Sequence, residues 1–163
     1  PNVSKMLPAV VARYPHGVPE LLIATDSPKV FEEVRAAVEE PGVGLRWARQ
    51  GRYVVPNLEE RSADLVIADL QIGSMGGYAI AMDMALETGA KRMSQTPALL
   101  LLDRRPDVFL ARRTGVQGWL MKPLDPIRLR RAVAALLAGG TYYDETFLPQ
   151  PANVLTATEA SAG

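Results

Sequence analysis

The sequence contains no cysteine and a single histidine, His16. Without cysteine the chain can form neither a disulfide nor a thiolate nucleophile nor a cysteine-ligated zinc site, and one histidine is too few for a histidine-based metal site. Long hydrophobic runs are also lacking, because the longest, such as Ala98 to Leu102, fall far short of the roughly 20 apolar residues of a membrane helix. The N-terminus carries no charged-then-apolar export signal. We therefore expect a cytoplasmic protein with no membrane partner.

An excess of charge of either sign is absent as well. Lysine plus arginine equals aspartate plus glutamate, at 18 each, so the overall charge does not indicate binding to nucleic acid. Arginines do gather at residues 104–113 and 128–131, where they could dock an acidic partner or phosphates. We interpret them as solvated helix faces and expect no nucleic-acid partner.

The 163 residues, 48% of them hydrophobic, suit one α/β domain in which apolar and amphipathic segments alternate. The apolar segments predict five strands, at residues 21–24, 45–49, 65–68, 98–102 and 116–121. The amphipathic segments predict five helices, at about residues 28–38, 54–61, 78–88, 106–113 and 126–137. Right-handed crossovers then give a doubly wound, five-stranded parallel sheet of order 2-1-3-4-5, a flavodoxin-like (βα)5 fold.

The ends of the chain lack this pattern. Residues 1–19 contain several prolines and are interpreted as a lead-in, residues 20–140 as the domain, and residues 141–163 as a tail that we expect to be flexible. The aromatic pair Tyr142-Tyr143 could lie against the edge of the sheet or support self-association as a homodimer. Simple packing is the interpretation that we favour.

Three charged residues follow alternate strands of the predicted sheet. Asp26, Asp69 and Lys122 follow the first, third and fifth strands within two residues, so the topology predicts that they meet at one edge. Two carboxylates with a nearby backbone carbonyl suit Mg²⁺, and an ammonium group beside them would neutralise charge on a phosphoryl group attacked by Asp69. Taken singly, each aspartate could equally be a turn former and Lys122 a solvated lysine.

The segments that carry these residues resemble the response-regulator receiver family. Leu21 to Pro28, Asp64 to Gly77 and Gly118 to Pro123 match its motifs in the right order, and the resemblance extends over residues 20 to 138. It implies a two-component signalling protein whose upstream partner is a histidine kinase or phosphotransfer protein. It also implies a cis peptide bond before Pro123.

The resemblance assigns a role to five positions. Asp69 matches the phosphate-accepting aspartate, Asp26 an acidic Mg²⁺ ligand, and Gln71 the residue whose backbone carbonyl joins Asp26 and Asp69 as a metal ligand. Lys122 matches the phosphate-sensing lysine, and Trp119 stands where the family keeps its switch aromatic.

Three positions depart from the family pattern. Thr25 precedes Asp26 where the family usually has a second acid, so we expect weakened Mg²⁺ binding. Leu102 stands where a threonine or serine hydroxyl is expected, so the hydroxyl relay of the switch is missing. Asp103 follows it, and if a one-residue slip places Asp103 at the hydroxyl position, its carboxylate would either repel a phosphoryl group or hydrogen-bond Lys122 permanently.

These observations predict an atypical, stand-alone response regulator and not an enzyme. In this hypothesis Asp69 accepts a phosphoryl group, and output passes to a downstream protein through protein–protein contacts. The alternative is a pseudo-receiver, an interaction module that works without phosphorylation. A third hypothesis, a small enzyme that uses Asp26 and Asp69 as an acid and base pair, requires a substrate pocket that the sequence does not indicate.

Overall fold

The structure is a computed structural model that describes residues 5–12, 14 and 17–146. Its strands form one parallel sheet in the order β2-β1-β3-β4-β5-β6. The strands are β1 (Glu20–Ala24), β2 (Gly44–Ala48), β3 (Leu65–Asp69), β4 (Ala98–Leu102), β5 (Gly118–Met121) and β6 (Tyr142–Tyr143). The first five follow the predicted order 2-1-3-4-5 and confirm the fold class.

The predicted number of strands was one too low. The short strand β6 adds to the free edge of β5, with Tyr142 opposite Gly118 and Tyr143 opposite Trp119. Local pattern did not predict it because two residues are too few to show an alternation. It lies within residues 141–163, for which we expected a flexible tail, and the structure describes that segment only as far as Thr146.

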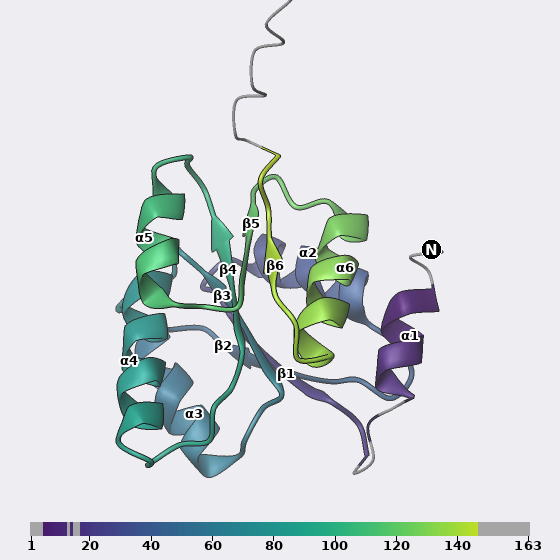
Figure 1. Cartoon of the computed structure of the whole chain (residues 1–163), viewed down its shortest axis with the longest axis horizontal. Helices are drawn as coiled ribbons and strands as arrows, with labels where there is room; N and C mark the ends of the chain where they lie inside the picture. The colour runs from purple at the N-terminus through teal and green to yellow at the C-terminus, as the bar shows by residue number, and fades with distance from the viewer. Residues whose placement is uncertain (1–4, 13, 15–16, 147–163) are drawn as a thin grey trace, which may run out of the picture.

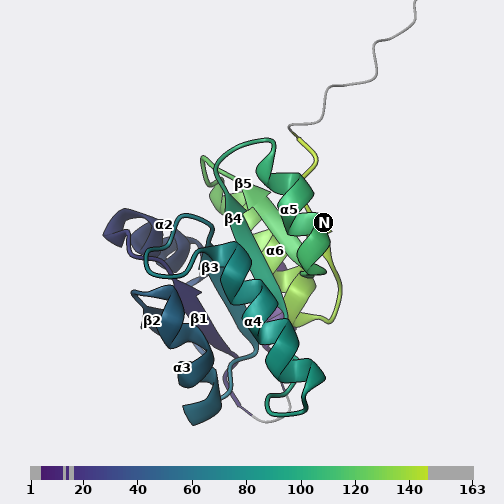
Figure 2. The ribbon, with the colours of Figure 1, turned by 90° about the vertical axis from the view of Figure 1, so that its left-hand side faces the viewer.

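Helices cover both faces of the sheet (Figures 1 and 2). The α-helices are α1 (Met6–Val11), α2 (Pro28–Val38), α3 (Val54–Glu60), α4 (Gly77–Gly89), α5 (Asp107–Thr114) and α6 (Pro126–Leu137), and the 3-10 turn η2 (Gly51–Tyr53) precedes α3. Helices α1, α2 and α6 pack on one face, and α3, α4 and α5 on the other. Among the described helices none has the length and hydropathy needed to span a bilayer.

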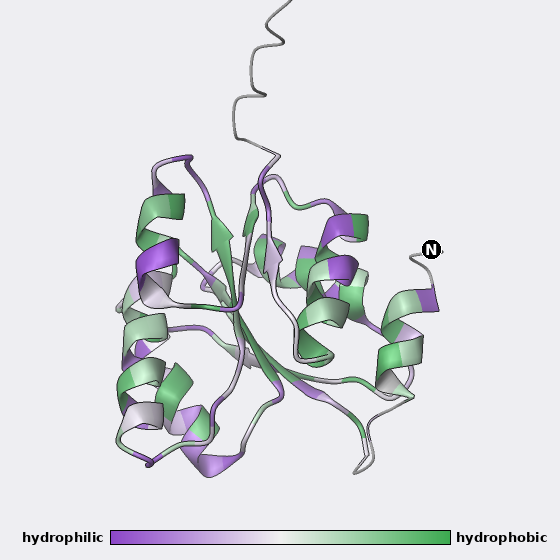
Figure 3. Cartoon of the chain, in the orientation of Figure 1, coloured by the Kyte–Doolittle hydropathy of each residue, from purple (hydrophilic) through white to green (hydrophobic). Residues whose placement is uncertain are grey.

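The core consists of two clusters of buried hydrophobic residues, one on each face of the sheet. Figure 3 shows that the strands are mostly hydrophobic, whereas the helices mix hydrophobic and hydrophilic residues. Successive side chains of a strand point to opposite faces, so Leu22 and Val66 enter the layer beneath α3, α4 and α5 while Leu21 and Leu65 enter the other. Strands β3 and β4 are buried along their whole length, which explains their continuous apolar runs.

Local capping determines where two of the helices begin. The Ser27 hydroxyl accepts the backbone N–H of Val30 at 3.3 Å, and Pro28 fills the first position of α2. The Asp125 carboxylate caps α6 in the same way, with 2.7 Å to the N–H of Ile127.

Candidate functional site

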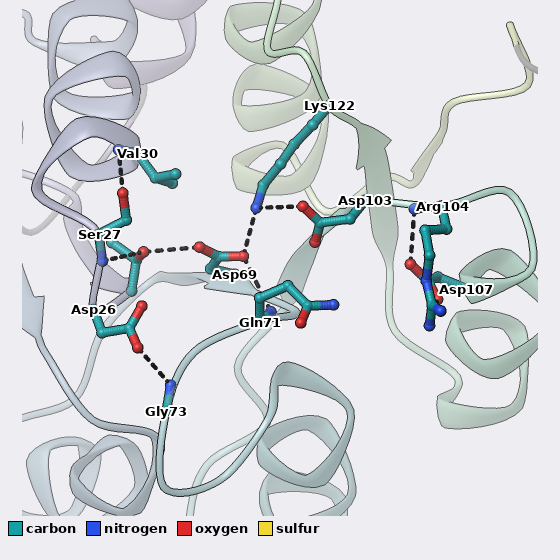
Figure 4. Close-up of polar contacts among 11 residues, drawn as sticks. Asp26, Ser27, Val30, Asp69, Gln71, Gly73, Asp103, Arg104, Asp107 and Lys122 are labelled. Atoms are coloured by element: carbon teal, nitrogen blue, oxygen red, sulfur yellow. Dashed lines mark hydrogen bonds and ion pairs between the residues drawn. The ribbon is translucent and has the colours of Figure 1, made fainter.

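The carboxyl ends of β1, β3 and β5 bring the predicted site residues to one edge of the sheet (Figure 4). Asp69 is the last residue of β3, and Lys122 directly follows β5. Their side chains meet, with 2.7 Å between the Lys122 ammonium and Asp69 Oδ1. The convergence that the topology predicts is therefore present for this pair.

The Asp69 carboxylate is buried, with 2% of the residue exposed. Its Oδ1 accepts from Lys122 and also from the backbone N–H of Gln71 at 3.2 Å. Its Oδ2 accepts from the Thr25 hydroxyl at 2.9 Å. A buried carboxylate is stable only when it is paired and hydrogen-bonded, and these three donors meet that requirement.

Thr25 has a role that the sequence did not reveal. Its hydroxyl is fully buried, donates to Asp69 and accepts the backbone N–H of Ser27 at 3.1 Å. The position that the family pattern assigns to an acid thus supplies a neutral hydrogen-bond donor. No sequence signal distinguishes this role from the simple loss of a charge, because the contact joins residues 44 positions apart.

Lys122 bridges two carboxylates. Besides Asp69, its ammonium contacts Asp103 Oδ1 at 3.0 Å, which is the arrangement expected if Asp103 engages the lysine. Burial alone would lower the pKa of Lys122, but the hydrogen bonds and charges of Asp69 and Asp103 outweigh it and raise the pKa above its usual value. The two carboxylates therefore hold the positively charged Lys122 side chain in place. The peptide bond between Lys122 and Pro123 is cis, as the resemblance implies.

The strand-four side of the site lacks a hydroxyl. Leu102 is the last residue of β4, is fully buried and pairs with Met121 of β5. Asp103 is the first residue beyond the strand, and the loop continues with Arg104, whose backbone N–H donates to Asp107 at 2.8 Å. The polar group that faces Lys122 from this loop is consequently a carboxylate.

Oxygen donors suited to Mg²⁺ lie on the loops after β1 and β3. Asp26 is exposed, and its Oδ2 accepts the backbone N–H of Gly73 at 2.9 Å. In Figure 4 its carboxylate faces the region between Asp69 and the loop of Gln71. Within the described part of the chain no three histidine, cysteine or acidic side chains gather as a metal site. Two carboxylates and a backbone carbonyl fit Mg²⁺ in kind, with one acid fewer than the family pattern.

Trp119 lies on β5, three residues before Lys122. It is 4% exposed, and the ring of Tyr143 covers it with 4.3 Å between the centroids. The guanidinium of Arg112 on α5 lies 5.9 Å from the indole centroid. The aromatic residue singled out in the sequence is thus enclosed by α5 and by β6.

Known proteins match this chain over the same region. A family model for the response regulator receiver domain matches residues 21–134. The protein PilH of Pseudomonas aeruginosa is 25% identical over 121 residues, which are 73% of this chain and 98% of PilH. The response regulator Rre1 of Synechocystis is 29% identical over 121 residues, 72% of this chain and 51% of that protein, so this chain spans about half of Rre1.

Solved structures agree with the sequence comparisons. A signal receiver domain of a histidine kinase from Syntrophus aciditrophicus superposes with a TM-score of 0.65 and 28% identity, covering 83% of this chain and 99% of that domain. The chemotaxis response regulator CheY4 of Vibrio cholerae superposes with a TM-score of 0.64 and 21% identity, and the match covers 73% of this chain and 98% of CheY4. The second likeness shows the shared fold alone.

Proposed function

Because the chain belongs to the response regulator receiver family, a family of signalling modules, we propose that it accepts a phosphoryl group on Asp69 and signals through protein–protein contacts. The observation that carries this proposal is the 2.7 Å contact between Lys122 and the buried Asp69 at the carboxyl edge of the sheet. The upstream partner in this proposal is a histidine kinase or a histidine phosphotransfer protein.

The proposed reaction is a transfer between two side chains. An Asp69 oxygen attacks the phosphorus of a phosphohistidine, the O–P bond forms as the N–P bond breaks, and the imidazole leaves with the electron pair and takes up a proton. The product is an acyl phosphate. Lys122 is placed to neutralise charge on the phosphoryl oxygens, while Thr25 keeps Asp69 Oδ2 hydrogen-bonded and so orients the carboxylate.

Asp26, Asp69 and the backbone carbonyl of Gln71 are the groups that would hold Mg²⁺. When bound, the ion would supply further positive charge to the phosphoryl oxygens. Thr25 hydrogen-bonds Asp69 without adding negative charge, so we propose that the affinity for Mg²⁺ is lower than with a second acid.

Intact mass measurement after incubation with a small-molecule phosphodonor and millimolar Mg²⁺ tests the acceptor. We expect the mass of one added phosphoryl group in the wild type and none in Asp69→Asn. The matched control is Asp83→Asn on α4, which should be modified as the wild type is. An unmodified wild type, or a modification that survives Asp69→Asn, contradicts the proposal.

A second candidate is a pseudo-receiver whose contacts do not depend on phosphorylation. The ion pair between Lys122 and Asp103, at 3.0 Å, and the absence of a hydroxyl at Leu102 favour it. The variant Asp103→Ala distinguishes the two. If Asp103 merely slows transfer, removing its charge speeds modification of Asp69 by about tenfold, the effect of roughly 1.4 kcal/mol on the barrier. If neither the wild type nor Asp103→Ala is modified, the pseudo-receiver is the better description.

A further inference from the structure

The indole of Trp47 on β2 is linked by hydrogen bonds to the site of Asp69. Strand β2 lies at the border of the sheet beside β1 (Figure 2), and their pairing ends with Ala24 opposite Ala48. Beyond that pair the Thr25 N–H still donates to the carbonyl of Ala48 at 3.0 Å. The Thr25 carbonyl accepts from a side chain, the indole N–H of Trp47, at 2.8 Å. Trp47 therefore binds the same residue that donates its hydroxyl proton to Asp69.

The ring of Trp47 is held in one orientation. Phe31 of α2 stacks on it with 4.0 Å between the ring centroids and 11° between the planes. The guanidinium carbon of Arg49 lies 4.0 Å from the indole centroid. Two groups cannot occupy one face of a ring at this distance, so they contact the indole from opposite sides. Stacking and cation–π contacts of this kind favour a single ring orientation, which fixes the direction of the indole N–H.

Trp47 completes a set of contacts that fixes Thr25. The backbone N–H of Thr25 is bound by Ala48, and its carbonyl is bound by Trp47. Its hydroxyl oxygen accepts the backbone N–H of Ser27 at 3.1 Å and donates to Asp69 Oδ2 at 2.9 Å. A hydroxyl hydrogen can rotate about the C–O bond, so the backbone position of Thr25 and the bond from Ser27 decide where its proton points.

The direction of that proton matters because the two oxygens of Asp69 have different partners. Oδ1 accepts from the Lys122 ammonium and from the backbone N–H of Gln71. Among the described residues, Thr25 is the one that donates to Oδ2. The Thr25 hydroxyl thus fixes the plane of the carboxylate from the Oδ2 side. The orientation of a nucleophile strongly affects the rate of its attack.

We propose that Trp47 is a positioning residue for phosphoryl transfer to Asp69. In this proposal, which rests on the proposed function, the indole N–H holds the carbonyl of Thr25, and Thr25 in turn orients the Asp69 carboxylate. Trp47 contacts neither the phosphoryl group nor Asp69. Its effect on the reaction therefore passes through Thr25.

The variant Trp47→Phe keeps an aromatic ring in the stack but removes the N–H. We expect it to slow the modification of Asp69 by acetyl phosphate and Mg²⁺ by about fivefold, the effect of one neutral hydrogen bond. Intact mass measured over time gives the rate. The matched control is Tyr53→Phe, which removes a polar group from a neighbouring aromatic residue that is 49% exposed. This control should react as the wild type does.

A double-mutant cycle distinguishes positioning from a general loss of structure. If Trp47 acts through the Thr25 hydroxyl, Trp47→Phe should cause no further slowing in a Thr25→Val background, where no hydroxyl remains to be oriented. Equal slowing in both backgrounds overturns the proposal, because Trp47 then acts by another route. A wild-type rate in Trp47→Phe overturns it as well.

The NMR chemical shift of the Asp69 carboxyl carbon tests the same contacts without a phosphodonor. We expect Trp47→Phe to move this shift in the same direction as Thr25→Val does, and Tyr53→Phe to leave it unchanged. Asp69→Asn identifies the resonance. An unmodified wild type overturns the proposed function, and the orientation of Asp69 by Trp47 is then decided by this shift. An unchanged shift in Trp47→Phe contradicts it.

A second measurement applies if Trp47→Phe does not fold. The indole N–H resonance of Trp47 should move in Asp69→Ala, because Thr25 loses the carboxylate to which its hydroxyl donates. The same resonance should stay in place in Tyr53→Phe. An indole resonance that is unchanged in Asp69→Ala overturns the coupling between Trp47 and Asp69.

Discussion

At the scale of single residues, the hydrogen bonds of Asp69 decide what its site can do. The carboxylate accepts hydrogen bonds from Thr25, Gln71 and Lys122. The Lys122 ammonium also donates to Asp103. With two carboxylates on one lysine, this cluster keeps one negative charge. The buried Asp69 is thus stabilised by protein groups that a metal or a phosphoryl group would partly replace.

The variant Thr25→Asp tests the balance between protein donors and metal. It replaces a fully buried hydroxyl that contacts Asp69 at 2.9 Å, so it adds an uncompensated charge and should lower the free energy of unfolding by roughly 3 kcal/mol without metal. Millimolar Mg²⁺ should then raise its Tm more than it raises that of the wild type, as thermal unfolding with and without Mg²⁺ shows.

The control for this variant is Thr25→Val, which removes the hydroxyl without adding charge. We expect it to lose about 1 kcal/mol of stability and to gain nothing from Mg²⁺ beyond what the wild type gains. Should Mg²⁺ raise the Tm of Thr25→Asp and Thr25→Val equally, a carboxylate at position 25 does not contribute to Mg²⁺ binding.

At the scale of elements, close contacts between loops and helix ends position the site. Helix α4 starts at Gly77, whose N–H donates to the carbonyl of Leu70 at 3.1 Å. An added Cβ at Gly77 would lie 2.9 Å from both the carbonyl oxygen of Asp69 and the Cα of Leu70. The start of α4 is therefore pressed against the backbone of Asp69 and Leu70.

Gly77→Ala should lower the free energy of unfolding by about 1–3 kcal/mol. The added Cβ would meet backbone atoms of Asp69 and Leu70, which cannot move aside as the end of a flexible side chain can. Chemical denaturation measures the change. Gly89→Ala is the matched control at the other end of α4, where an added Cβ meets nothing within 4 Å, and it should be neutral or up to about 1 kcal/mol stabilising. Equal effects of the two substitutions would show that the contact with Asp69 is not tight.

At the scale of the whole molecule, residues 142–146, which begin as β6, tie the border of the sheet to α6. Asp144 joins β5 through Met121 and α6 through Arg128, so its charge contributes to the stability of the entire domain. Burial alone would raise the pKa of Asp144, but hydrogen bonds from Thr146 and from the N–H of Met121, with the charge of Arg128, outweigh it and lower the pKa.

This lowered pKa predicts how stability depends on pH. A group whose pKa is lower in the folded state stabilises above its unfolded pKa, about 3.9 for aspartate, and loses that contribution as pH falls through the folded value. The difference in unfolding free energy between the wild type and Asp144→Asn should be constant near neutral pH and shrink below about pH 4. Denaturation curves at several pH values measure it, and a difference that grows on acidification would falsify the assignment.

Local pattern was sufficient for most of the fold. Apolar runs of the right length, amphipathic segments and the order of elements along the chain predict the five main strands, the five helices between and after them, and the meeting of Asp69 with Lys122. These features follow from sequence because periodicity and right-handed crossovers are properties of neighbouring residues and of chain order.

Tertiary structure decided the rest. The hydroxyl of Thr25 reaches Asp69 across 44 positions, Asp103 meets Lys122 across 19, and Asp144 meets Met121 across 23. Each contact depends on which side chains the packed sheet brings within about 3 Å, and no local propensity encodes that choice. The sequence therefore locates Asp69 and Lys122 at one edge of the sheet, whereas only the folded chain shows which groups donate to Asp69, which carboxylates contact Lys122, and that a sixth strand pairs with β5.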